Sequence, residues 1–183
     1  MKIRATLLNL LYPLVRLVGD LNIGPRYRLV KYIQAYMASR ALVDGDVVCT
    51  FAKGELTNLF IAGPYKHSGI YVQGQMLEST REGVHFTSVF DFLMSKDSFV
   101  IMRPLFLISV EKLKEAAMKY QGVPYDYFFE PGLKALTCAE CVGQVLADAA
   151  GKEIPFTKRK TLGVLTIHPS DFVEAQDKFR RVF

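Results

Sequence analysis

One cysteine of this chain stands where a helix is expected to begin. An irregular stretch containing Pro131-Gly132 precedes Cys138, and apolar residues recur behind it at helical spacing until Gly151 ends the helix at about Ala150. The start of a helix presents free N–H groups and the positive end of the helix dipole, which stabilise a thiolate over a thiol. Cys138 is therefore a candidate nucleophile, and the next question is which residue could act as its base.

The best candidate base is a histidine at the start of an expected β-hairpin. The run from His67 to Val72 is rich in strand formers, Gln73-Gly74 is a turn pair, and a second run extends to Thr80. A two-residue loop pairs position 67 with position 80 and leaves Glu78 one diagonal step away on the same face. A three-residue loop would put Glu78 on the opposite face, so this interpretation depends on the turn.

Together these residues would supply a nucleophile, a base and a group that orients the base. Two other carboxylates, Glu82 and Asp91, could replace Glu78 as the orienting group. The remaining histidines, His85 and His168, are interpreted as structural or surface residues. The predicted chemistry is nucleophilic acyl transfer through a thioester.

The order histidine, glutamate, cysteine is the reverse of the order in ordinary papain-like enzymes, and it resembles the circularly permuted papain-like branch of the NlpC-type hydrolases, the YiiX-like group. The resemblance extends from about Val43 to Phe172. The segments that carry it are Asp44-Gly45-Asp46-Val47-Val48, His67-Ser68-Gly69-Ile70-Tyr71, Leu77-Glu78-Ser79-Thr80 with Gly83-Val84, Gly122-Val123-Pro124-Tyr125-Asp126 and Thr137-Cys138-Ala139-Glu140-Cys141-Val142.

The resemblance implies an α+β, permuted papain-like fold, in which an antiparallel sheet packs against helices. It implies a cysteine amidase or peptidase that acts on a peptide or a cell-wall peptide through Cys138, His67 and Glu78 and needs no cofactor. It also implies that Tyr125 faces the substrate near the nucleophile. Two alternatives stay open: a lipid-directed acyl hydrolase or acyltransferase, as in the similar lecithin retinol acyltransferase group, and a non-catalytic module that binds a ligand.

A second thiol lies three residues after the first. Cys141 stands where the resemblance would place an aliphatic residue, and with Cys138 it forms the C-x-x-C spacing of redox proteins. A thioredoxin-like protein would carry a strand directly before this motif, and none is evident here. We therefore interpret Cys141 as a core residue, and we expect Glu140, two positions from Cys138, to be exposed.

The composition fits one globular domain with a real core. The chain has 183 residues, of which 50% are hydrophobic and 22% are charged. No stretch approaches the roughly 20 apolar residues that span a bilayer. Three cysteines do not suit a disulfide framework, and neither zinc-ligand spacing nor a glycine-rich phosphate loop occurs. No metal site is expected.

Positive charge is concentrated at the N-terminus. Residues 1–40 carry seven basic residues against Asp20 alone, a net charge of +6, so the remainder nets −1. Residues 1–40 are interpreted as a basic amphipathic helical extension, and residues 41–183 as the permuted papain-like catalytic domain. A leucine stripe within residues 1–25 is expected to pack against the domain or against a second copy in a homo-oligomer.

Two other interpretations of this segment remain: peripheral contact with anionic membrane through residues 1–25, or an atypical signal peptide interrupted by Arg16. A cytoplasmic or membrane-peripheral location is favoured, and secretion is the alternative. Nucleic acid is not an expected partner, because the basic residues lie among leucines rather than among aromatic and polar side chains.

The rest of the chain shows a mixed pattern of helices and strands. Helices are expected over residues 27–41, 88–94, 109–120 and 138–150, strands over 47–51, 67–72, 76–80, 84–87 and 99–103 and within 160–167, and a last helical piece after the turn at 168–172.

Overall fold

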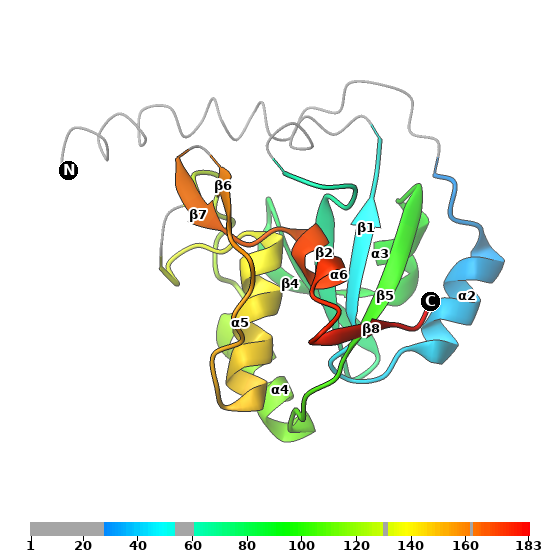
Figure 1. Ribbon diagram of the computed structural model, residues 1–183. Coiled ribbons are helices and arrows are strands. Elements are labelled where there is room, and N and C mark those ends of the chain that lie inside the picture. Colours follow the sequence, from blue (N-terminus) through cyan, green and yellow to red (C-terminus); the bar gives the residue numbers. More distant parts are fainter. Residues whose placement is uncertain (1–27, 54–60, 130–131, 162) are drawn as a thin grey trace.

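The computed structural model describes residues 28–53, 61–129, 132–161 and 163–183, and its main element is a six-stranded antiparallel sheet (Figure 1). The strand order is β4-β3-β2-β1-β5-β8. The strands of this sheet are β1 Val47–Phe51, β2 His67–Val72, β3 Gln75–Thr80, β4 Gly83–Ser88, β5 Ser98–Pro104 and β8 Phe179–Arg181. A separate two-stranded hairpin consists of β6 Arg159–Thr161 and β7 Val164–Thr166. This α+β architecture confirms the expected fold class.

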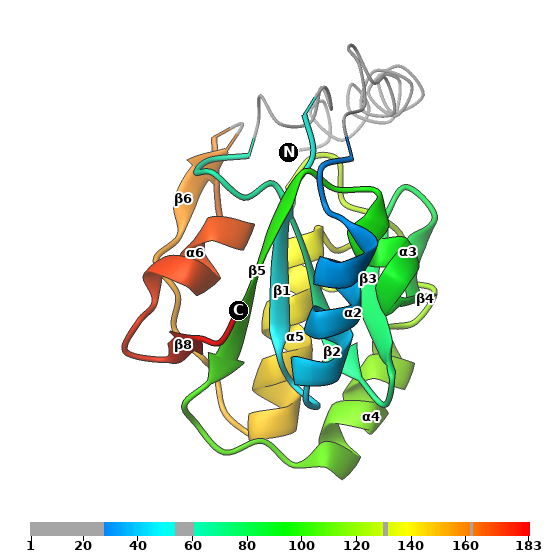
Figure 2. The same ribbon diagram turned by 90° about the vertical axis from the view of Figure 1, so that its right-hand side faces the viewer.

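Helices cover both faces of the sheet. They are α2 Tyr32–Ala41, α3 Val89–Met94, α4 Val110–Tyr120, α5 Cys138–Ala150 and α6 Pro169–Glu174. Figures 1 and 2 show α4 and α5 on one face and α2 and α3 on the other. Because side chains alternate along a strand, β1 serves both faces: Val47 and Cys49 are buried with the α4 and α5 residues, and Val48 with those of α2 and α3.

The hairpin that was expected to set the site has the predicted turn. Val72 pairs with Gln75, so the loop contains only Gln73 and Gly74. Both residues have positive φ, 48° and 90°, as the twist of a two-residue hairpin requires. Gly69 then lies opposite Glu78, which leaves Glu78 one diagonal step from the start of β2.

The structure adds elements at the C-terminal end. The region 160–167, where one strand was expected, forms the β6–β7 hairpin, and β8 pairs with β5 as an unexpected sheet edge. The leucine stripe of residues 1–25 and part of the loop after Lys53 lie outside the described residues. Among the helices that are described, none is long and apolar enough to cross a membrane.

Candidate active site

Helix α5 begins sharply at Cys138 because its first turn is capped on both sides. The Thr137 hydroxyl accepts a hydrogen bond from the Glu140 N–H at 3.2 Å, and the Glu140 carboxylate accepts one from the Thr137 N–H at 3.0 Å. The Thr166 hydroxyl of β7 donates to the other Glu140 oxygen at 2.8 Å. Glu140 is therefore half-buried, and the expectation that it is exposed was wrong: it ties the start of the helix to β7.

His67 and Glu78 form a short hydrogen bond on the face of the sheet that α2 and α3 cover. The distance from His67 Nε2 to Glu78 Oε2 is 2.6 Å, and the two side chains are only 14% and 10% exposed. The ring of Phe92 from α3 lies 5.5 Å from the imidazole, centroid to centroid. A Cβ atom at Gly69 would come within 2.9 Å of that ring, so glycine at this position makes room for Phe92 beside the histidine.

The sulfur of Cys138 reaches this pair at the end of the sheet. His67 is the first residue of β2, and interaction with the Cys138 side chain helps to raise the pKa of its imidazole. Ser68, the next residue of β2, is fully buried, and its interaction with Cys138 helps to lower the pKa of the Cys138 thiol. The structure thus brings Cys138, His67 and Glu78 into one chain of contacts, and it adds Ser68, which the sequence had not singled out.

These contacts favour charge on all three groups. Burial opposes a thiolate at Cys138, but hydrogen bonding to His67, the charge of His67 and the contacts with Ser68 outweigh it and lower the pKa of the thiol. Burial also opposes charge on His67, but hydrogen bonds to Cys138 and Glu78 raise its pKa to about 9. The pKa of Glu78 is lowered, because the His67 interactions outweigh its burial. These shifts favour the thiolate–imidazolium form of the Cys138–His67 pair, next to a carboxylate.

The other two cysteines have the opposite electrostatics. Burial, together with the charge of Cys138, raises the pKa of both Cys49 and Cys141. Cys49 also donates a hydrogen bond from its sulfur to the Pro169 carbonyl at 3.2 Å. Both side chains are packed in the core, as was expected for Cys141.

This difference predicts selective alkylation. At pH 7, iodoacetamide should modify Cys138 on the order of 100-fold faster than Cys49 or Cys141, because only its thiol has a lowered pKa. Peptide mass spectrometry after brief labelling measures the three rates, and a urea-unfolded sample, in which all three should react alike, is the control. Equal rates for Cys138 and Cys141, or an oxidised pair, would contradict this and support redox chemistry.

The Tyr125 phenol is within the electrostatic influence of Cys138. Burial raises the pKa of the Tyr125 phenol, and the charge of Cys138 raises it further. The Tyr125 ring packs edge-on against Tyr127 with centroids 4.9 Å apart, and its backbone bridges to Leu136, just before α5. Tyr125 and Cys138 therefore interact, and the expectation that Tyr125 faces a substrate stays a prediction.

The two remaining histidines have different surroundings. His168 is buried, with Nδ1 accepting from the Ala62 N–H at 3.2 Å and Nε2 2.9 Å from the Thr161 hydroxyl, a structural position. His85 lies directly opposite Glu78 on β4, and its Nε2 is 3.8 Å from Glu78 Oε1. Treating His85 only as a structural or surface residue missed this contact, which the turn between β3 and β4 could have indicated.

The carboxylates considered as alternatives to Glu78 lie elsewhere. Glu82 is exposed and pairs with Arg81 at 4.0 Å. Asp91 lies in the first turn of α3, whose N-cap is Ser88, and the Ser88 hydroxyl donates to the Asp91 carboxylate at 2.6 Å. Glu78 is the carboxylate that contacts His67.

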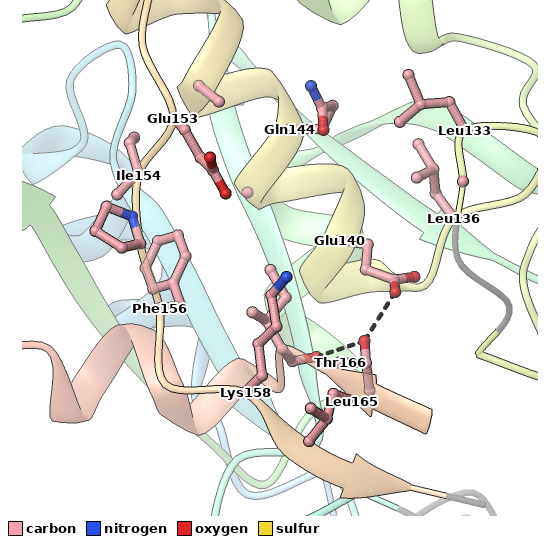
Figure 3. A pocket seen from close by; sticks show the side chains of 15 residues that line it. Leu133, Leu136, Glu140, Gln144, Glu153, Ile154, Phe156, Lys158, Leu165 and Thr166 are labelled. Atoms are coloured by element: carbon pink, nitrogen blue, oxygen red, sulfur yellow. Dashed lines mark hydrogen bonds between the residues drawn. The ribbon is translucent and has the colours of Figure 1, made fainter. Parts of the chain in front are cut away.

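A separate pocket of about 510 Å³ lies against the outer side of α5 (Figure 3). Its wall includes Leu136, Glu140, Gln144, Phe156 and Leu165, a mixture of apolar and charged side chains. Cys138, His67 and Glu78 do not line it. The pocket therefore borders the capped start of the helix rather than these three side chains. Within the described ranges, no group of three or more His, Cys, Asp or Glu residues is arranged to hold a metal ion.

Comparison with known families gives the identity of this arrangement. Residues 41–180 match the model of Peptidase_C92, described as the permuted papain-like amidase enzyme, YaeF/YiiX, C92 family. The chain belongs to this family. It is therefore a permuted papain-like enzyme of the cysteine amidase and peptidase class, and the resemblance inferred from the sequence is confirmed.

A solved structure supports the same fold. The crystal structure of a protein described as the metalloprotein yiiX, from Escherichia coli O157:H7, superposes with a TM-score of 0.66 at 20% sequence identity. The match covers 78% of this chain and 97% of that one. At this identity the likeness shows the C92 fold and does not transfer the metal. A comparison with curated proteins found no match.

Proposed function

We propose that the protein hydrolyses amide bonds through a thioester acyl-enzyme, with Cys138 as the nucleophile. The Cys138 thiolate attacks the carbonyl carbon, a C–S bond forms, and the carbonyl π electrons move to the oxygen. When the tetrahedral intermediate collapses, the C–N bond breaks and the leaving nitrogen takes a proton from the His67 imidazolium. Neutral His67 then removes a proton from water, which attacks the thioester and releases the acid and the thiolate.

Glu78 and the helix start have supporting roles in this proposal. Glu78 accepts the His67 Nε2–H, which fixes the imidazole tautomer and stabilises its cation. The Cys138 N–H belongs to the first turn of α5 and can stabilise the oxyanion, with Tyr125 close by. Tyr125 would contact the substrate beside the scissile bond.

One observation carries the proposal: a single thiol of three has a lowered pKa, and it is the thiol that contacts a histidine held by a carboxylate. A cysteine with only a structural role would gain nothing from this arrangement, because the free energy gained by pairing buried charges goes first to offset the cost of burying them. A perturbed thiol and imidazole in contact are instead characteristic of a catalytic site.

The amide would belong to a peptide or a cell-wall peptide. A lipid-directed acyl hydrolase or acyltransferase is the second candidate, and an exposed apolar surface on α2 favours it. Both chemistries pass through a thioester on Cys138, so the acyl donor distinguishes them.

A direct test is to trap the acyl-enzyme. The full-length protein is mixed with a panel of aminoacyl- and peptidyl-aminomethylcoumarins, and in parallel with phospholipid vesicles, then quenched in acid within seconds. We expect fluorophore release and an intact-mass increase equal to one acyl group, located on the peptide that contains Cys138. Acylation from phospholipid alone would replace the amide substrate with a lipid. Absence of acylation by either donor would favour a ligand-binding module.

A further inference from the structure

The outer face of α2 carries a stripe of large apolar side chains that the described chain leaves uncovered. Its members are Leu29 (61% exposed), Tyr32 (65%), Ile33 (58%), Tyr36 (48%) and Met37 (55%). Positions 32–33 and 36–37 follow the helical repeat and form one row on α2, and Leu29 is exposed in the non-helical chain just before the helix. These five residues are here called the α2 stripe. Figure 2 shows α2 in front of the sheet, as the outermost element on that side.

Packing within the fold accounts for little of the α2 stripe: the Tyr32 ring stacks on Phe90 with centroids 5.3 Å apart, yet Tyr32 remains 65% exposed. The helix contacts the protein mainly through the small residues Ala35 and Ala38, which are fully buried, with Val30 just before it. An ordinary surface helix places polar residues on the face opposite such contacts. The α2 stripe does the reverse, and a row of exposed large apolar side chains marks a surface that binds something.

Basic residues border the α2 stripe at both ends. Arg28 and Lys31 precede its first turn, Arg40 lies in its last turn, and all three are exposed. No Asp or Glu occurs between Leu21 and Val43, and the first turn of α2 contains no acidic residue. Basic residues near a helix N-terminus oppose the helix dipole, so this charge pattern does not serve helix stability.

We propose that the α2 stripe binds the surface of an anionic lipid bilayer. Leu29, Ile33 and Met37 would enter the boundary between headgroups and acyl chains. Tyr32 and Tyr36 suit that boundary, because each has an apolar ring and a polar hydroxyl. Arg28, Lys31 and Arg40 would lie among the anionic headgroups. This inference concerns attachment to a surface and does not depend on the chemistry proposed for Cys138.

Charge favours the bilayer over two other possible occupants of the α2 stripe, a second copy of the protein and residues 1–27 of the same chain. A second copy would bring the same three cations against the α2 stripe, without a carboxylate on the facing α2. Residues 1–27 of the same chain carry four basic residues against Asp20, a net charge of +3, and are thus also of like sign. Like charges repel across an interface, whereas anionic headgroups complement all of them.

Vesicle co-sedimentation of the full-length protein tests the proposal. We expect binding to phosphatidylcholine vesicles that contain a quarter phosphatidylserine, with a partition constant at least about tenfold above that for phosphatidylcholine alone. The double variant I33S/M37S should lower this constant at least about tenfold. L107S/M118S removes two apolar side chains that are 93% and 57% exposed elsewhere, and it should bind like the unmodified protein.

A charge series completes the test. R28Q/K31Q/R40Q should lose about tenfold or more in partition constant, whereas K114Q/K134Q/K152Q, with the same change in net charge on exposed lysines elsewhere, should lose much less. C138A should bind normally, which separates attachment from catalysis.

Several results would overturn the proposal. These are no binding to anionic vesicles, equal loss in the stripe and control variants, or a dimer that only I33S/M37S disrupts. Binding that appears only after residues 1–27 are deleted would instead show that this segment covers the α2 stripe.

Discussion

Replacing Cys138 with alanine should lower kcat/KM for amide hydrolysis by at least about 10⁴-fold. The sulfur forms the bond to the acyl group, so no other residue can substitute for it, and loss of a nucleophile has effects of this size or larger in other hydrolases. The measurement is fluorophore release from the aminomethylcoumarin that proves to be the best substrate. The fold should persist, because Cys138 occupies the first turn of a helix that Thr137 and Glu140 cap independently.

C141A is the matched control for this variant. Cys141 is equally buried and lies one turn along the same helix, but the pKa of its thiol is raised. Truncating it should cost stability on the order of 1 kcal/mol through lost packing, visible as a lower Tm, with activity reduced only a few-fold. A C138A protein that retains substantial activity, or a C141A protein as inactive as C138A, would contradict the assignment of the nucleophile.

Local rules were sufficient to predict the parts of the site that depend on neighbours in the sequence. The pair Gln73-Gly74 predicted a two-residue turn, and the register of β2 and β3 then placed Glu78 on the face of His67. The start of α5 was readable because irregular chain precedes Cys138 and apolar spacing follows it, and Gly151, with φ 67°, ends the helix as expected.

Contacts between distant segments could not be predicted in this way. Whether the end of β2 would meet the start of α5 depends on how the helix packs across the sheet, so the part played by Ser68 was missed. The link from Glu140 to Thr166 requires the β6–β7 hairpin, whose three-residue strands carry no alternating pattern. β8 is equally short, and its pairing with β5 is set by the tertiary fold.

Glu78 contacts two histidines, of which only one was expected to be its partner. Glu78 was predicted as the partner of His67, and His85 was considered apart from it. In the structure Glu78 lies between the two rings, 2.6 Å from one and 3.8 Å from the other. A two-residue turn between β3 and β4 pairs positions 78 and 85, just as the turn between β2 and β3 sets the register of those strands. The sequence therefore carried a signal for the contact between Glu78 and His85.

Replacing His67 with glutamine should lower kcat/KM by roughly 10³-fold and change its pH dependence. A general acid and base contributes about 10²- to 10⁴-fold, and His67 also stabilises the thiolate. In the unmodified enzyme, activity should fall as pH rises through about 9, where His67 loses the proton needed by the leaving amine. It should fall on the acid side as the Cys138 thiolate is protonated, below the usual thiol pKa.

The variant should lose the decline near pH 9. Without the imidazolium, burial raises the pKa of Cys138, so its iodoacetamide rate at pH 7 should drop and recover only in alkaline solution. H85Q is the matched control: its ring lies on the same face and approaches Glu78 only at 3.8 Å, so it should retain both limbs of the profile and most of the activity. If H67Q kept the decline near pH 9, or if H85Q removed it, the titrating base would not be His67.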